Sequence, residues 1–135
     1  MTVQYTSADN WTRQRDILRC NPLFYGRKRE DTVIIQGPPG ELWFGRLKAL
    51  FRLASPHPLH KHGIAMVQYF DASDSQAATD IRMRTVQESQ KTEFIFLTSV
   101  VRACHVIPQF GDNRKPTRYY VNDLVDGDML LRLRR

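Results

Sequence analysis

Residues 40–71 constrain the fold more than any other part of the chain. From Trp43 to Leu53 the odd positions are apolar or glycine, whereas the even positions mix basic with apolar side chains. Because successive residues of a strand face opposite sides, this pattern predicts a long curved strand with one buried face. A second apolar segment, residues 64–70, ends in an aromatic pair before an acidic turn. We expect the two segments to pair and to form the spine of an all-β domain.

One alternative stays open within this stretch. Residues 47, 50, 51 and 54 are apolar at helical spacing, and residues 42–54 include no β-branched side chain. Such a segment fits a helix as well as a strand on its pattern alone. Residues 47–54 are therefore either the second half of the long strand or a short helix.

The rest of the chain predicts a mainly β fold, a small distorted β-barrel of six to eight short strands. Strands are expected at 32–36 and 118–121, and Gly-Pro-Pro-Gly at 37–40 predicts the turn of a hairpin. Residues 7–20 are interpreted as a short N-terminal helix capped by Ser7, with one or two helical turns elsewhere at most. Residues 124–133 are ambiguous. We divide the chain into a helical, basic arm packed on the body, residues 1–30, and a barrel domain, residues 31–135.

The chain of 135 residues is strongly basic, with a formal net charge of +6 and an isoelectric point of about 9.7. Residues 13–29 alone carry a net charge of +5, and the C-terminus is also rich in arginine. Such a balance favours phosphate backbones, anionic membranes or acidic protein tails as partners, and a plain solvated face is the alternative. The candidate nucleic-acid-binding residues are Arg27, Lys28, Arg29, Arg132 and Arg134.

No pattern in the sequence points to catalysis. Cys104 and His105 are adjacent, so on a strand their side chains would face opposite sides. The histidines at 57, 60 and 62 share a loop with two prolines and fit no zinc-binding spacing. We therefore expect no catalytic residue, no bound metal and no cofactor. An apolar run of about 20 residues, which a membrane-spanning helix needs, does not occur, so we expect no membrane partner.

The aromatic residues are more informative. Trp43, Tyr69 and Tyr119 lie at or near the ends of expected strands, where a barrel could gather them into a cage for a methylated lysine. The alternative is that Trp43 fills the core, which leaves Tyr69 and Tyr119 as the more credible surface residues.

Five segments together resemble the bromo-adjacent homology (BAH) domain. They are residues 32–35 (TVII), 43–47 (WFGRL), 67–70 (VQYF), 93–96 (EFIF) and 99–106 (SVVRACHV). The same run, with residues 110–111, 119–121 and 128–131, is similar to BAH-like domains near the ends of large fungal transposon-encoded proteins. This resemblance covers about 100 residues, and it also favours a strand over residues 47–54.

The resemblance implies a distorted β-barrel that acts in the nucleus as a non-enzymatic, chromatin-associated interaction module. Its partner would be a chromatin protein, with a histone tail as the candidate ligand. In members that read methyl-lysine, the Trp of a V-x-W-F strand contributes to the cage, and Tyr69 holds that position here. The acidic residue that commonly follows it would be Asp71 or Asp74. The alternative function is that of a basic accessory domain that binds DNA or another nucleic acid for a transposon-encoded protein.

Overall fold

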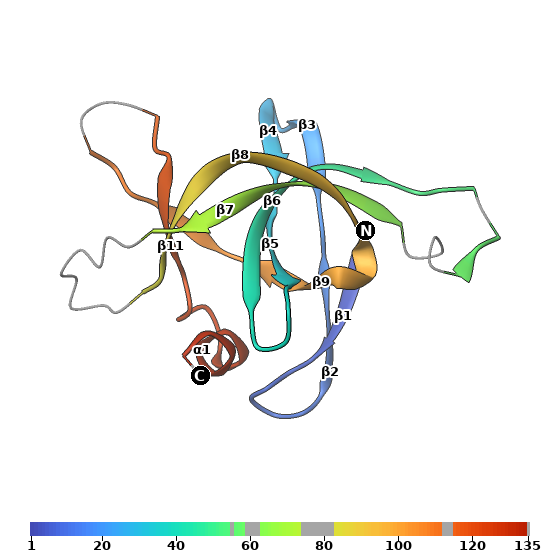
Figure 1. The fold of residues 1–135 in the computed structure, drawn as a ribbon, viewed down its shortest axis with the longest axis horizontal. Coiled ribbons are helices and arrows are strands. Elements are labelled where there is room, and N and C mark those ends of the chain that lie inside the picture. Colours follow the sequence, from blue (N-terminus) through green and yellow to red (C-terminus); the bar gives the residue numbers. More distant parts are fainter. Residues whose placement is uncertain (55, 59–62, 74–82, 112–114, 135) are drawn as a thin grey trace.

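The computed structural model describes residues 1–54, 56–58, 63–73, 83–111 and 115–134 (Figure 1). Over these residues the chain folds into one large antiparallel sheet, two short hairpins and a single α-helix. The sheet consists of β5 (Thr32–Gln36), β6 (Leu42–Phe51), β7 (Ile64–Ala72), β8 (Thr85–Phe96), β9 (Val100–Cys104), β10 (Val106–Pro108) and β11 (Arg118–Val121). The hairpins are β1 (Thr2–Thr6) with β2 (Arg13–Ile17) and β3 (Cys20–Phe24) with β4 (Arg27–Glu30), and the helix is α1 (Gly127–Leu133). The predicted mainly β, barrel-like fold is confirmed.

The barrel-like curl of the sheet follows from its strand order, β10-β11-β8-β7-β6-β5-β9. The two edge strands, β9 and β10, are consecutive in the chain and only His105 separates them. β9 pairs with β5 at one edge, whereas β10 pairs with β11 at the other edge. One bent run of residues therefore joins both edges, and the sheet must curl round to let it do so.

The spine of the sheet is the β5–β6 hairpin. Its turn at residues 37–40 is the one that the sequence predicts, and Gly40 has the left-handed φ of 84° that suits glycine. β6 continues as a strand to Phe51, so residues 47–51 are a strand and not a helix. Gly45 lies where β6 and β7 pack tightly, because a Cβ there would come within 2.4 Å of Val67 Cγ1.

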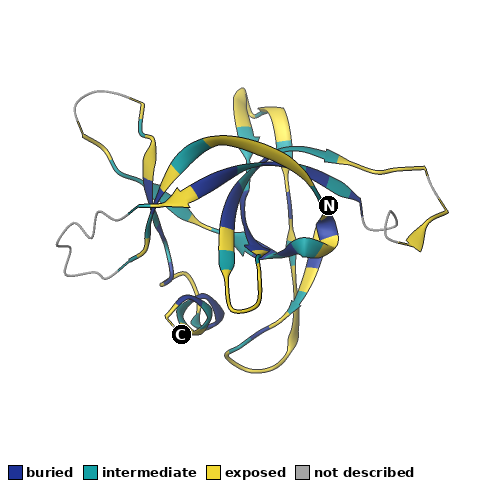
Figure 2. Ribbon diagram, in the orientation of Figure 1, coloured by how far each residue is buried: buried dark blue, intermediate teal, exposed yellow. Residues whose placement is uncertain are grey.

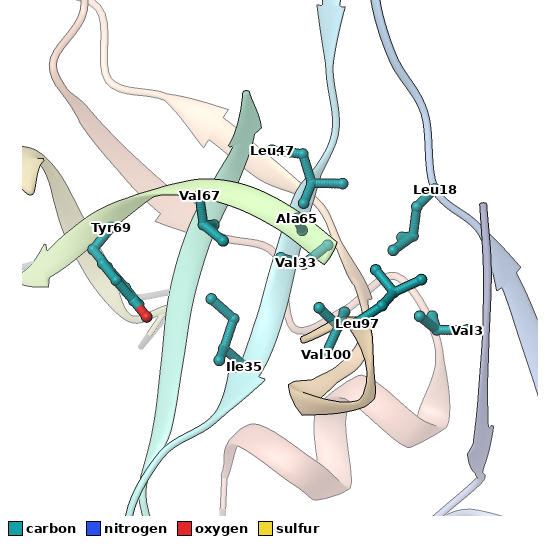
Figure 3. Close-up of a cluster of buried hydrophobic side chains, with 10 residues drawn as sticks. All are labelled: Val3, Leu18, Val33, Ile35, Leu47, Ala65, Val67, Tyr69, Leu97 and Val100. Carbon is teal, nitrogen blue, oxygen red and sulfur yellow. The ribbon is translucent and has the colours of Figure 1, made fainter. Parts of the chain in front are cut away.

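One face of the curled sheet carries the first core (Figure 3). It draws alternate residues from β5, β6 and β7 together with apolar side chains from the N-terminal segment and from the 3₁₀ turn Leu97–Ser99. Its members are Val3, Leu18, Val33, Ile35, Leu47, Ala65, Val67, Tyr69, Leu97 and Val100. Because Val3 and Leu18 belong to it, the N-terminal segment helps to build the core.

The opposite face carries the second core, which α1 covers. This core consists of Ile34, Phe44, Phe70, Val86, Tyr119, Val121, Met129 and Leu133. The helix begins after Asp126, whose side chain accepts a hydrogen bond from the Met129 amide at 2.8 Å. The ambiguous segment at 124–133 is therefore a capped helix over most of its length. β5 is buried on both faces, as Figure 2 shows in dark blue.

The predicted N-terminal helix over residues 7–20 is wrong. This segment contains β2 and the first residue of β3, and β2 pairs antiparallel with β1. Ser7 accepts a hydrogen bond from the Asp9 amide, but it does so in the turn of a β-hairpin. The helical spacing was misleading because Trp11 and Ile17 are 75% and 52% exposed, so only Leu18 of that apolar set faces the core.

Candidate functional site

The two N-terminal hairpins, residues 2–30, form a ribbon that carries a row of exposed basic residues on its outer side. β2 and β3 run end to end along one side of the barrel (Figure 1). Asp16 points inward, where it accepts a hydrogen bond from the Ala103 amide at 3.0 Å, and Leu18 is buried. Since neighbours in an extended chain face opposite sides, Arg15, Ile17 and Arg19 point to solvent.

We call Arg13, Arg15, Arg19 and Arg27 the arginine stripe. All four are exposed, and none of them makes an ion pair within the part of the chain that the structure describes. From Arg13 to Arg19 the extended chain covers about 20 Å, with alternate residues about 6.7 Å apart. Arg13, Arg15 and Arg19 thus form a linear array of guanidinium groups, and Arg27 lies on the neighbouring β3–β4 hairpin.

An exposed aromatic residue lies at each end of this ribbon. Trp11, in the turn between β1 and β2, is 75% exposed, and Tyr25, in the turn between β3 and β4, is 92% exposed. Both have a left-handed backbone, with φ of 59° for Trp11 and 47° for Tyr25. This conformation is costly for a bulky residue, and here it holds two large rings in water.

Of the five basic residues predicted to bind nucleic acid, only Arg27 belongs to the stripe. Lys28 pairs with Glu30 at 2.6 Å, and Arg29 pairs with Asp31 at 2.9 Å. The hydrogen bond and the charge of Glu30 raise the pKa of Lys28 above its ordinary value. Both cations thus have an acidic partner in the same segment, although Glu30 also pairs with Lys48 at 2.9 Å.

The two C-terminal candidates have acidic partners as well. Arg132 donates hydrogen bonds to both carboxylate oxygens of Asp128, at 2.8 and 3.1 Å, and Arg134 donates to Asp123 at 2.7 Å. The hydrogen bond to Asp123 raises the pKa of Arg134. The structure does not place these arginines beside Arg27 as one basic surface, because they fasten α1 and the segment before it.

A buried arginine, Arg102, which the sequence interpretation missed, links β9 to the start of α1 and to β2. The side chain of Arg102 is 7% exposed and donates hydrogen bonds to Asp126 at 2.9 and 3.1 Å and to Asp128 at 2.7 Å. Its guanidinium lies 3.5 Å from Asp16 and 4.5 Å from the centre of the Tyr5 ring. We call these five residues the Arg102 cluster. The signal in the sequence was an arginine within an apolar strand, followed by the Asp-Gly-Asp of residues 126–128.

The charges of the cluster stabilise one another. Burial opposes ionisation of Asp126, but hydrogen bonds from Arg102 and from the Met129 amide outweigh it, so the pKa of this carboxyl lies below its ordinary value. Asp128 is likewise lowered in pKa, by hydrogen bonds from Arg132, the Ala8 amide and Arg102. Burial opposes the charge of Arg102 too, yet its bonds to the two aspartates raise its pKa. Arg102, Arg132 and the amides of Ala8 and Met129 thus together offset the negative charges of Asp126 and Asp128.

Two of the predicted cage residues do meet. The rings of Trp43 and Tyr69 lie edge to face with centres 5.9 Å apart. Tyr69 is 7% exposed, and the ammonium of Lys91 already lies 5.4 Å from its ring centre. Burial, followed by its hydrogen bond to Glu93, raises the pKa of Tyr69. The ring of Trp43 also contacts the turn, because a Cβ on Gly37 would come within 2.9 Å of it.

The third predicted wall, Tyr119, belongs to the opposite face of the sheet. It packs on Phe70 in the second core, with ring centres 5.6 Å apart, and the guanidinium of Arg46 lies 5.0 Å from its ring centre. Its hydroxyl donates a hydrogen bond to Glu88 at 2.9 Å. The three aromatic residues therefore do not form one cage, and the expectation that Tyr119 joins the other two is wrong.

Asp71, the predicted acidic residue of the cage, remains a prediction. Asp71 is exposed on β7, two residues beyond Tyr69 and on the same side of the strand by alternation. Asp74, the other candidate, lies outside the described residues.

The structure gives no support to thiol or metal chemistry at the residues that it describes. Burial raises the pKa of the Cys104 thiol to about 12, so the thiol stays protonated near neutral pH. Among the described residues no group of three or more His, Cys, Asp or Glu could hold a metal ion, and His60 and His62 lie outside them. Nor does any helix in this part of the chain have the length and apolar character to cross a membrane.

A pocket of about 400 Å³ adjoins the stripe at Ile17. Its lining includes the carboxylates of Asp16, Glu30 and Asp31 against the single guanidinium of Arg29. Such a lining repels phosphate, so an anionic partner would contact the stripe and not the pocket.

Comparisons of the chain with family models, with curated proteins and with solved structures gave no match.

Proposed function

We propose that this chain is a non-catalytic nucleic-acid-binding module that contacts phosphates through the arginine stripe. The observation that carries the proposal is the row that Arg13, Arg15 and Arg19 form along one extended segment, exposed and without an acidic partner among the described residues. Arg52, Lys115 and Arg118 also lack an ion pair in that part of the chain, but they come from separate segments. A guanidinium binds phosphate with two parallel hydrogen bonds, and a row of them matches a linear polyanion.

Phosphate binding of this kind has a distinctive dependence on salt. Each neutralised phosphate releases counterions, so four contacts predict a slope of log affinity against log salt of about −3 for a single strand and about −4 for duplex DNA. The net charge of +6 adds long-range attraction at low ionic strength.

The test is a titration of fluorescently labelled oligonucleotides at salt concentrations from about 50 to 200 mM. The variant Arg13→Gln/Arg15→Gln/Arg19→Gln should lose most of the affinity and most of the salt slope. The matched control, Arg52→Gln/Lys115→Gln/Arg118→Gln, removes the same charge at exposed residues elsewhere and should bind nearly as wild type does. Equal losses in both variants would mean that net charge, and not the stripe, attracts the nucleic acid, and the proposal would fail.

One observation favours a second candidate, the binding of a methylated lysine in a chromatin protein such as a histone tail. It follows from the resemblance to BAH domains and rests on the Trp43–Tyr69 pair, beside which the ammonium of Lys91 already lies. A ligand ammonium would take the place of Lys91 against the Tyr69 ring.

The test of this candidate is a titration of the Lys91→Ala variant with histone peptides. Removal of the competing ammonium should increase the affinity for trimethylated peptides, and a further Trp43→Ala change, at the more exposed ring of the pair, should abolish it. If neither wild type nor Lys91→Ala binds any peptide at millimolar concentration, this candidate is excluded. Both functions would operate in the nucleus, which is where we propose that the chain acts.

A further inference from the structure

The two exposed rings at the ends of the ribbon indicate which nucleic acid the stripe binds. We propose that the partner is single-stranded and that Trp11 and Tyr25 stack on its unpaired bases, an inference that rests on the function proposed above. Proteins that bind single strands combine a basic track for the backbone with aromatic platforms for the bases. The ribbon has both parts.

The first argument is the exposure of the rings. Tyr25 is 92% exposed and contacts Phe24 edge to face, with ring centres 4.7 Å apart. Phe24 is in turn held by Arg29, whose guanidinium lies 4.8 Å from its ring centre. Phe24 therefore packs against its neighbours at the end of the β3–β4 hairpin, while the Tyr25 ring stays exposed to solvent. Trp11 is likewise 75% exposed. Rings that stabilise the fold are normally buried, so these two are available for an external partner.

The second argument is the backbone that presents them. Tyr25 and Gly26 form a two-residue turn with φ of 47° and 75°, and Phe24 and Arg27 pair on either side of it. Asn-Gly is the sequence best suited to such a turn, because asparagine tolerates the left-handed region and tyrosine does not. Trp11 has the same type of backbone, with φ of 59°. At both tips an aromatic residue occupies a position where a small polar residue would fold better, which is the kind of local strain found at functional sites.

The third argument is the arrangement of the tips relative to the stripe. The β1–β2 turn and the β3–β4 turn lie at opposite ends of the ribbon (Figure 1). Trp11 belongs to the first turn and Tyr25 to the second, and Arg13, Arg15 and Arg19 lie between them in the chain. The extended chain between the two rings is at most about 46 Å long, and sites for single strands cover about 4–16 nucleotides. In a duplex the bases are stacked inside, so the two rings would have nothing to bind.

The experiment compares single-stranded and duplex oligonucleotides of equal charge as ligands of three proteins. These are wild type, Trp11→Asn/Tyr25→Asn, which keeps residues that tolerate the left-handed turns, and the stripe variant Arg13→Gln/Arg15→Gln/Arg19→Gln. The Asn variant should lose roughly tenfold in single-strand affinity for each ring, keep its duplex affinity, and unfold at a temperature no lower than wild type. In a Trp43→Phe background, the fluorescence of Trp11 should be quenched by the single strand.

The outcomes separate this inference from the proposed function. If the Asn variant binds single strands as wild type does while the stripe variant does not, the stacking inference is overturned and phosphate binding by the stripe stands. If the stripe variant also binds as wild type does, the proposed function itself fails. Competition by polyglutamate as strong as that by a single strand of equal charge would show a general polyanion surface, which also overturns the inference.

Discussion

The Arg102 cluster and the arginine stripe use the same side chain in opposite ways. Arg102 is 7% exposed in its side chain and contacts two aspartates directly, whereas Arg13, Arg15 and Arg19 are exposed and have no acidic partner among the described residues. The two regions lie close together, because Asp16 of the ribbon points inward to the cluster while its neighbour Arg15 points outward. Along this one strand, the inward side chain of Asp16 belongs to the Arg102 cluster, and the outward side chain of Arg15 belongs to the stripe.

The difference shows where charge serves folding and where it does not. A buried guanidinium is stable only when carboxylates and hydrogen bonds replace the water that it has lost. An exposed guanidinium on a basic surface gains nothing for the fold and is repelled by its neighbours. We therefore infer that the stripe contributes little to stability, and we attribute a binding role to it.

The largest expected effect comes from breaking the cluster. Arg102→Ala leaves Asp126 and Asp128 without their central cation, so the free energy of unfolding should fall by about 3–5 kcal/mol. The matched change on the stripe, Arg15→Ala, should alter it by no more than about 0.5 kcal/mol. Both values can be measured by urea denaturation. Similar small losses in both variants would show that Arg102 is not the structural residue that we infer.

The second-largest effect is expected from acid, which should weaken the ion pairs of the Arg102 cluster. The pKa values of Asp126 and Asp128 are lower in the folded than in the unfolded chain, so their ion pairs contribute stability above the unfolded pKa of about 4. This stability should be lost as the pH falls through the folded values. Asp126→Asn keeps a capping side chain and should make the decline with acid shallower. A decline in unfolding free energy of identical slope in this variant would contradict the assignment.

A smaller effect, of opposite sign, is expected at the tip of the ribbon. Tyr25→Asn should raise the free energy of unfolding by about 0.5–1 kcal/mol, because asparagine tolerates the left-handed backbone that tyrosine resists. Thermal unfolding is a sufficient measurement, and Tyr25→Phe, which keeps the ring, is the control. If Tyr25→Asn lowers the unfolding temperature, the ring stabilises the hairpin.

The smallest effect on stability should come from the stripe itself. Arg13→Gln/Arg15→Gln/Arg19→Gln should change the free energy of unfolding by less than about 1 kcal/mol, with a slight gain expected at low salt from reduced repulsion. Denaturation at low and high ionic strength would reveal that gain. A clear loss would mean that these arginines have structural contacts.

Much of the sheet could be predicted from the sequence, because strands that are buried on one or both faces have a simple pattern. Residues 32–36, the turn at 37–40 and residues 118–121 lie where they were predicted. The N-terminal hairpins could not be predicted in this way. Trp11 and Ile17 are apolar but face water, so the usual link between apolar spacing and burial does not hold there.

The candidate site was predictable in its charge but not in its geometry. The net charge of residues 13–29 is visible in the sequence, yet the arginines that remain unpaired are decided by acidic residues elsewhere in the fold, such as Asp126 and Asp128 near Arg102. The aromatic cage failed for a related reason. Tyr69 and Tyr119 lie on opposite faces of the curled sheet, and a one-dimensional pattern does not reveal which face a distant strand presents.

The bonds between the two ends of the chain have a consequence for biosynthesis. The Ala8 amide donates to Asp128 at 2.6 Å, and Arg132 donates to the carbonyl of Thr6 at 3.0 Å. A ribosome makes the β1–β2 hairpin first and its partners in α1 more than 100 residues later. We therefore expect these two bonds, which complete the anchoring of the hairpin, to form only after residues 126–132 have left the exit tunnel. The surface that we propose for nucleic acid would then be set in place only in a finished domain, so incomplete chains would compete poorly for the same partner.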